Sequence, residues 1–104
     1  MTAAAKLPQL LSLLEQNLQA ENLWEHTSPS QEALSSTQPF AIDTLQPEQW
    51  LQWIFISKID SMLKSHQPLP QGFSIYPYFS EAWKGQADKS DILDVIKRID
   101  EACA

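Results

Sequence analysis

The chain has 104 residues, of which 43% are hydrophobic and 19% charged, and this balance is typical of a globular domain and excludes a disordered one. Its 13 acidic and 7 basic residues give a net charge of −6. Apart from Lys97-Arg98 the sequence has no basic cluster, which argues against direct binding to nucleic acid or to an anionic membrane. Two glycines are too few for a phosphate-binding Gly-rich loop.

The sequence shows no feature of a secreted or membrane protein. Its N-terminus lacks a positively charged segment followed by an apolar run, and no apolar run approaches the ~20 residues that cross a bilayer. Cys103 is the sole cysteine, so an intramolecular disulfide is impossible. We expect a cytoplasmic protein with a single domain over residues 1–104.

A first helix is predicted from the recurrence of Leu7, Leu11, Leu14 and Leu18. Because proline is tolerated only in the first turn, Pro8 places the start of this helix near residues 4–7. Its end is expected near residues 21–23.

The next segment, residues 25–38, is polar and predicts a loop with room for one helical turn at residues 31–34. The end of this loop carries the apolar side chains of Pro39, Phe40 and Ile42. Because these can be buried against the rest of the domain, we expect the loop to be ordered.

A second helix is expected to begin at Asp43 or Thr44, either of which can act as its N-terminal cap, with Pro47 in its first turn. Wound at 3.6 residues per turn as far as Lys64, it places its strongest apolar residues on one core-facing side. These are Leu51, Phe55, Ile56, Ile59, Met62 and Leu63.

Residues 67–72 contain two prolines and a glycine and break this helix. A short third helix is predicted from about Tyr76 to Lys84, because Pro77 suits a first helical turn and Gly85 a stop. A fourth helix opens at Asp88 or Ser90, with an apolar stripe at Ile92, Val95, Ile96 and Ile99. The expected fold is an all-α four-helix bundle with a long ordered loop between its first two helices.

Five segments carry a distinctive pattern: Ser36–Phe40, Asp43-Thr44, Glu48–Ile56, Gln67–Pro70 and Tyr76–Tyr78. Together they resemble the YqcC-like family of small bacterial proteins of unknown function. The resemblance implies a small helical domain, and members are often encoded beside a tRNA pseudouridine synthase. It brings no catalytic residues.

The candidate site is an aromatic patch where the loop, the second helix and the third helix are expected to meet. Trp50 and Trp53 lie on the outward side of the second helix and need a cover, from either the loop or a partner. Gln52 falls within the core-facing arc, so we expect its buried amide to bond with backbone groups of residues 38–43. The full candidate set is Phe40, Asp43, Trp50, Gln52, Trp53, Tyr76, Tyr78 and Phe79.

The favoured function is a non-enzymatic interaction or regulatory domain that binds a protein partner, or a second copy of itself, through this patch. The alternative is a small-molecule pocket between the second and third helices. No catalytic residue, metal ligand or cofactor is predicted. His26 and His66 lack metal-ligand spacing, and Cys103 is expected in a frayed terminus without a histidine partner.

Overall fold

The computed structural model describes residues 3–104, which are helical or irregular and contain no strand. The all-α class is therefore confirmed. The elements are α1 (Ala3–Ala20), α2 (Gln31–Leu34), η1 (Pro39–Ala41), α3 (Pro47–Trp50), η2 (Leu51–Ile56), α4 (Ser57–Lys64), α5 (Tyr76–Ala82), η3 (Ala87–Lys89) and α6 (Ser90–Ala102). A four-helix bundle in the strict sense is not confirmed, because one-turn helices interrupt the connections and α5 spans seven residues.

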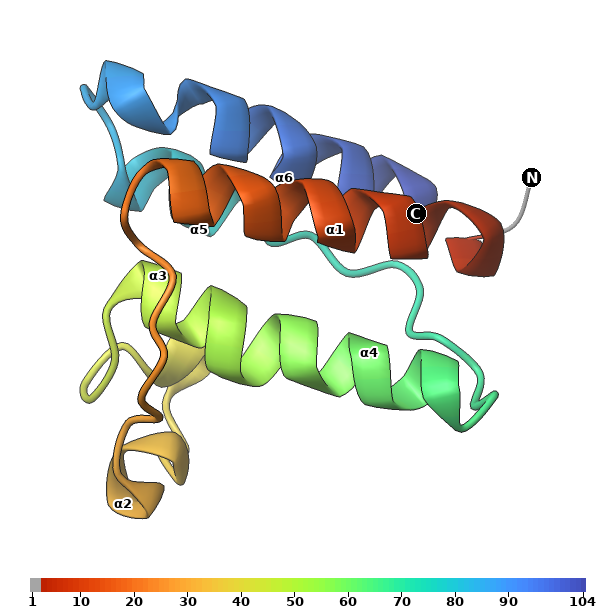
Figure 1. The fold of residues 1–104 in the computed structure, drawn as a ribbon, viewed down its shortest axis with the longest axis horizontal. Coiled ribbons are helices and arrows are strands. Elements are labelled where there is room, and N and C mark those ends of the chain that lie inside the picture. The colour runs from red at the N-terminus through yellow and green to blue at the C-terminus, as the bar shows by residue number, and fades with distance from the viewer. Residues whose placement is uncertain (1–2) are drawn as a thin grey trace.

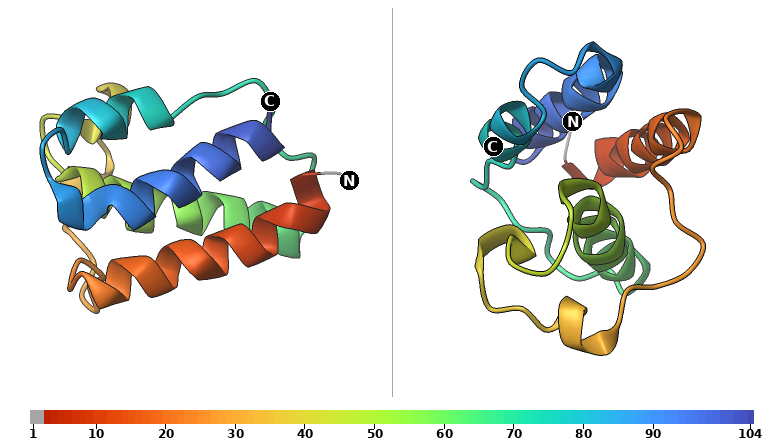
Figure 2. Two further views of the ribbon diagram at one scale, coloured as in Figure 1. Left: turned by 90° about the horizontal axis from the view of Figure 1, so that it is seen from above. Right: turned by 90° about the vertical axis from the view of Figure 1, so that its left-hand side faces the viewer.

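The second predicted helix is one continuous rod made of α3, η2 and α4. Its central segment, η2, is wound as a π-helix, whose hydrogen bonds span five residues instead of four. Figure 1 shows this rod running beside α1, while α1 and α6 lie against each other. The views in Figure 2 show α5 on the side of α6 that faces away from α1, where it packs against α6.

One hydrophobic core joins these helices. The stripe predicted for α1 is confirmed, because Leu7, Leu14 and Leu18 are completely buried and Leu11 is nearly so. The opposing side chains come from the rod, α5 and α6, and include Leu51, Phe55, Ile59, Phe79, Trp83, Ile92, Val95, Ile96 and Ile99. No helix of residues 3–104 is long and apolar enough to cross a membrane.

The helix starts differ from the prediction in two places. Helix α1 begins at Ala3, so Pro8 lies beyond its first turn, at the cost of one hydrogen bond to the carbonyl of Ala4. Neither Asp43 nor Thr44 caps the second helix. The cap is Gln46, whose backbone N–H donates to the side-chain oxygen of Gln49 at 2.8 Å, in the manner of a capping box.

The C-terminus is packed into the core, and the expected frayed end is wrong. The Cys103 side chain is completely buried, and its carbonyl accepts a 2.7 Å hydrogen bond from the backbone N–H of Gly72. Burial raises the pKa of the Cys103 thiol, and the neighbouring Asp100 carboxylate raises it further.

Candidate functional site

Phe40 is the centre of an aromatic cluster between the loop, α3 and α5. Its ring stacks on Tyr78 at 4.1 Å between centroids and lies 4.8 Å from Trp50 and 6.3 Å from Phe79. Four of the eight candidate residues therefore meet; Phe79 is buried, whereas Phe40, Trp50 and Tyr78 remain partly exposed. The Phe40 ring occupies the space where the alternative small-molecule pocket was expected.

The backbone that inserts Phe40 is strained. Phe40 and Ala41 have φ angles of 57° and 48°, in the left-handed region that is costly for residues with a Cβ. Ala41 is buried, and its carbonyl accepts from the backbone N–H of Leu45, itself buried, at 2.8 Å. The packing of the partly buried Phe40 ring against Trp50, Tyr78 and Phe79 offsets the strain, which gives Phe40 a structural role in the domain.

Tyr78 lies at the edge of this cluster and remains partly exposed. Burial raises the pKa of its hydroxyl, and the negative charge of Glu48 raises it further. Both effects disfavour the charged phenolate form of Tyr78.

Gln52 is buried, as predicted, and its amide bonds with backbone groups, but with those of another residue. Its Oε1 accepts from the backbone N–H of Glu25 at 2.8 Å, and its Nε2 donates to the Glu25 carbonyl at 2.7 Å. The expected partners in residues 38–43 are wrong. Gln52 fixes the beginning of the loop, where the chain leaves α1, instead of its end.

The Glu25 carboxylate binds the same helix through side chains. Trp53 Nε1 donates to it at 3.0 Å, and Gln49 Nε2 lies 3.3 Å from both of its oxygens. Trp53 is thereby held against Glu25, whereas Trp50 packs on Phe40 and Phe79. Glu25 was not among the predicted residues, and no local pattern marks it.

The two remaining candidates have structural contacts. Asp43 is exposed and accepts a hydrogen bond from the Ser36 hydroxyl. The backbone N–H of Tyr76 donates to the Asp100 carboxylate at 2.8 Å. Neither side chain contributes a hydrogen bond to the Glu25 network.

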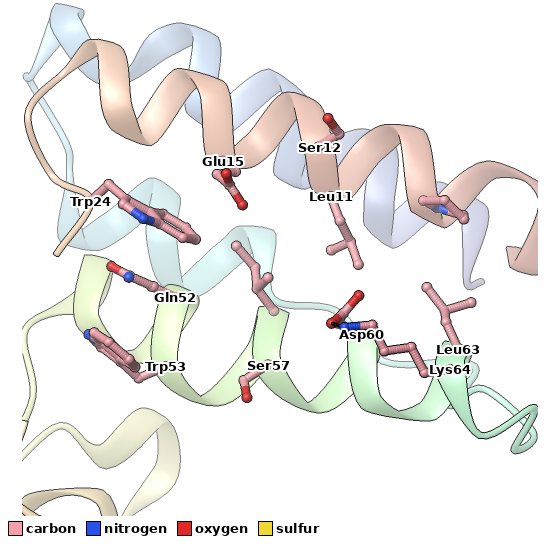
Figure 3. A pocket seen from close by; sticks show the side chains of 12 residues that line it. Leu11, Ser12, Glu15, Trp24, Gln52, Trp53, Ser57, Asp60, Leu63 and Lys64 are labelled. Carbon is pink, nitrogen blue, oxygen red and sulfur yellow. Dashed lines mark ion pairs between the residues drawn. The ribbon is translucent and has the colours of Figure 1, made fainter. Parts of the chain in front are cut away.

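The largest recess described lies elsewhere, between α1 and the rod. It is a groove of about 600 Å³, with Leu11, Ser12 and Glu15 on the α1 wall and Trp24 at one end. The opposite wall comes from the rod and consists of Gln52, Trp53, Ile56, Ser57, Asp60, Leu63 and Lys64. Figure 3 shows the carboxylates of Glu15 and Asp60 pointing into the space between the two walls.

Trp53 also borders a second recess on the outer side of the rod. This one measures about 540 Å³ and includes Leu34, Ile54 and Met62 among its lining residues. Within residues 3–104, no group of three or more His, Cys, Asp or Glu side chains is placed to hold a metal ion. Of these two recesses, the groove between α1 and the rod is the larger.

The comparisons with known proteins give a consistent family. The family model described as "DUF446: tRNA pseudouridine synthase C" matches residues 6–102. An uncharacterized protein of Haemophilus influenzae is 38% identical over 93 residues, which cover 89% of this chain and 88% of that protein. The uncharacterized protein YqcC of Escherichia coli is 37% identical over 82 residues, covering 79% and 75% of the two chains.

Two further matches are a larger protein and a solved structure. The tRNA pseudouridine synthase C of Pectobacterium carotovorum is 34% identical over 86 residues, covering 83% of this chain but 23% of that enzyme. The solution NMR structure of E. coli YqcC has a TM-score of 0.86 and 32% identity, over all of this chain and 90% of that one. The predicted resemblance to YqcC-like proteins is confirmed.

One prediction is overturned by these names. The sequence was interpreted as that of a non-enzyme because it lacks a catalytic motif. Yet both the family description and the Pectobacterium relative name an enzyme, tRNA pseudouridine synthase C. The absence of a recognisable motif in a single sequence was too weak a ground for excluding an enzyme.

Proposed function

The chain belongs to the family described as DUF446, tRNA pseudouridine synthase C, and we propose that it works in tRNA pseudouridine synthesis by binding the remaining part of such a synthase. The observation that carries this proposal is the difference in coverage between two relatives. The matched segment is a minor part of the Pectobacterium synthase but most of the Haemophilus protein.

A domain that occurs both inside a larger enzyme and nearly alone has a natural partner in the rest of that enzyme. Covalent linkage raises the effective concentration of two domains for each other to the millimolar range, so that weak contacts are sufficient. A separate chain has to bind through its own surface. The sequence led us to expect a protein partner, and we identify that partner as the synthase.

The charge of the domain supports a protein partner of this kind. An enzyme that acts on tRNA needs Lys and Arg to neutralise phosphates, so its surface is basic near the substrate. A domain with a net charge of −6 is attracted to such a surface and repelled by tRNA itself. Electrostatic steering then favours association with the enzyme.

Only part of the predicted aromatic patch belongs to the binding surface that we propose. Phe40, Trp50, Tyr78 and Phe79 pack against one another. Gln52 and Trp53 line the groove beside α1. A small-molecule pocket between the rod and α5 is not favoured, because the Phe40 ring packs there against Trp50, Tyr78 and Phe79.

The test uses this chain and the full-length tRNA pseudouridine synthase C of the same organism. We expect a 1:1 complex in light scattering after size-exclusion chromatography, which weakens as salt is raised. Pseudouridine in tRNA, measured by mass spectrometry, should decrease in cells that lack this chain and return when it is supplied. Separate elution at low salt, together with unchanged pseudouridine, would refute the proposal.

A further inference from the structure

We propose that the groove between α1 and the rod is the docking site for an amphipathic helix of the synthase that carries a basic residue on one flank. This inference rests on the proposed function and names the surface and the type of segment that it recognises. The groove runs between two helical walls. One wall is α1, which packs closely against α6, and the other wall is the rod.

The walls have the chemistry that a helix in a groove requires. Their accessible apolar surface comes from Pro8 on α1 and from Ile56 and Leu63 on the rod, with the indoles of Trp24 and Trp53 at one end. Both tryptophans are only partly buried. An amphipathic helix recognises such a surface with apolar side chains spaced three and four residues apart.

The length of the groove fits a short helix better than a compact molecule. On the rod its lining residues extend from Gln52 to Lys64, which corresponds to about 18 Å at 1.5 Å per residue. A helix of ~12 residues, or roughly three turns, covers that distance. A small-molecule site would instead enclose most of its ligand, whereas this groove is partly open to solvent.

The charges select a basic flank. Glu15 on α1 and Asp60 on the rod place one carboxylate on each wall. Asp60 pairs with Lys64 at 2.9 Å, whereas Glu15 has no cationic partner in the described part of the chain. A Lys or Arg of the incoming helix can therefore pair with Glu15 without breaking an existing ion pair, and the rim excludes acidic helices.

The decisive experiment measures the affinity of the full-length synthase for charge-reversed variants of this chain. Glu15→Lys and Asp60→Lys alter the groove. Their matched controls are Glu101→Lys and Asp94→Lys on α6, outside the groove. Asp94 is a close match for Asp60, because it forms an exposed i,i+4 ion pair with Arg98 at 3.0 Å. We expect each groove variant to bind about tenfold more weakly and each control to bind within about twofold of the wild type.

A third groove variant, Ser12→Trp, fills the space without changing charge and should also weaken binding. Thermal unfolding of every variant checks that the fold is retained. If the wild type binds the synthase and all three groove variants bind equally well, the groove is refuted while the proposed function stands. If the wild type does not bind, both fall. A homodimer of the isolated chain that Ser12→Trp dissociates would assign the groove to self-association instead.

Discussion

The side-chain amide of Gln52 pairs with both backbone groups of Glu25, 27 residues earlier in the sequence. The two bonds resemble those between neighbouring strands, except that one partner is a side chain. They join the rod to the segment that leaves α1. Because Gln52 is buried and the two bonds are partly buried, water can replace the lost partners only incompletely when they are removed.

Gln52→Leu should lower the free energy of unfolding by an amount toward the lower end of about 2–6 kcal/mol, since each unsatisfied backbone group costs about 1–3 kcal/mol, two are affected, and both are only partly buried. For a domain of this size, the melting temperature should fall by roughly 10 °C or more. Urea unfolding followed by circular dichroism measures the effect. The matched control is Gln16→Leu on the exposed face of α1, which should stay within about 0.5 kcal/mol. Equal stability of the two variants would show that the Gln52 bonds contribute nothing net.

Asp100 performs a similar task between α6 and α5. Its carboxylate accepts from the backbone N–H groups of Ile75 and Tyr76 at 3.0 and 2.8 Å, and so caps the N-terminus of α5 from a neighbouring helix. Asp100→Ala should cost about 1–2 kcal/mol, the usual loss for a helix cap, and should increase amide exchange at Ile75 and Tyr76. Hydrogen exchange monitored by NMR is the suitable measurement. Asp94→Ala, also on α6, serves as the control, and similar exchange in both variants would contradict the capping role.

The sequence predicted what depends on neighbours along the chain. The leucine stripe of α1 and the isoleucine stripe of α6 were correct, because spacings of three and four residues determine which side of a helix is apolar. The burial of Gln52 followed from the same reasoning. Its partner did not, since the choice between Glu25 and residues 38–43 depends on how the loop crosses the rod.

Three errors have identifiable physical causes. The Gln46–Gln49 cap was not predicted, because glutamine is not one of the usual N-cap residues Ser, Thr, Asp and Asn. The helical wheel placed Trp50 and Trp53 together, but Trp50 packs on Phe40 and Phe79 whereas Trp53 bonds with Glu25, contacts that depend on how the loop folds. Finally, Lys89 was not expected in the interior. It is buried beside the Trp83 ring and bonds with Gln86 and Asp88.

The C-terminal end of α4 offers a stabilising substitution. His66 adopts a φ of 56°, and the two hydrogen bonds of a Schellman motif follow, from His66 N–H to Leu63 and from Gln67 N–H to Met62. Because glycine takes this conformation without a steric penalty, His66→Gly should raise the free energy of unfolding by about 1 kcal/mol.

The same motif at the end of α1 supplies the control. Asn22 has a φ of 60°, and asparagine tolerates this region better than most residues. Asn22→Gly should therefore gain less than His66→Gly in the same chemical denaturation experiment. A loss of stability in His66→Gly would mean that its imidazole makes a contribution larger than the backbone strain.

Cys103 gives a prediction for pH dependence and reactivity. Burial, assisted by Asp100, holds the pKa of this thiol above its ordinary value of 9.0 in the folded protein. The folded state therefore retains the proton at a pH where the unfolded chain has lost it. The contribution to stability is complete below pH 9 and disappears as the pH rises through the folded-state pKa.

Two measurements check this reasoning. Reaction with a thiol-specific reagent at pH 8 should be slow in the native protein and become rapid in urea, because the native thiol is both buried and protonated. The decline in unfolding free energy above pH 9 should be shallower in Cys103→Ala than in the wild type, although its stability at pH 7 is lower because of the cavity. Rapid labelling of the native protein at pH 8 would show that the last turn of α6 opens frequently, and the packing of Cys103 against the core would then be marginal.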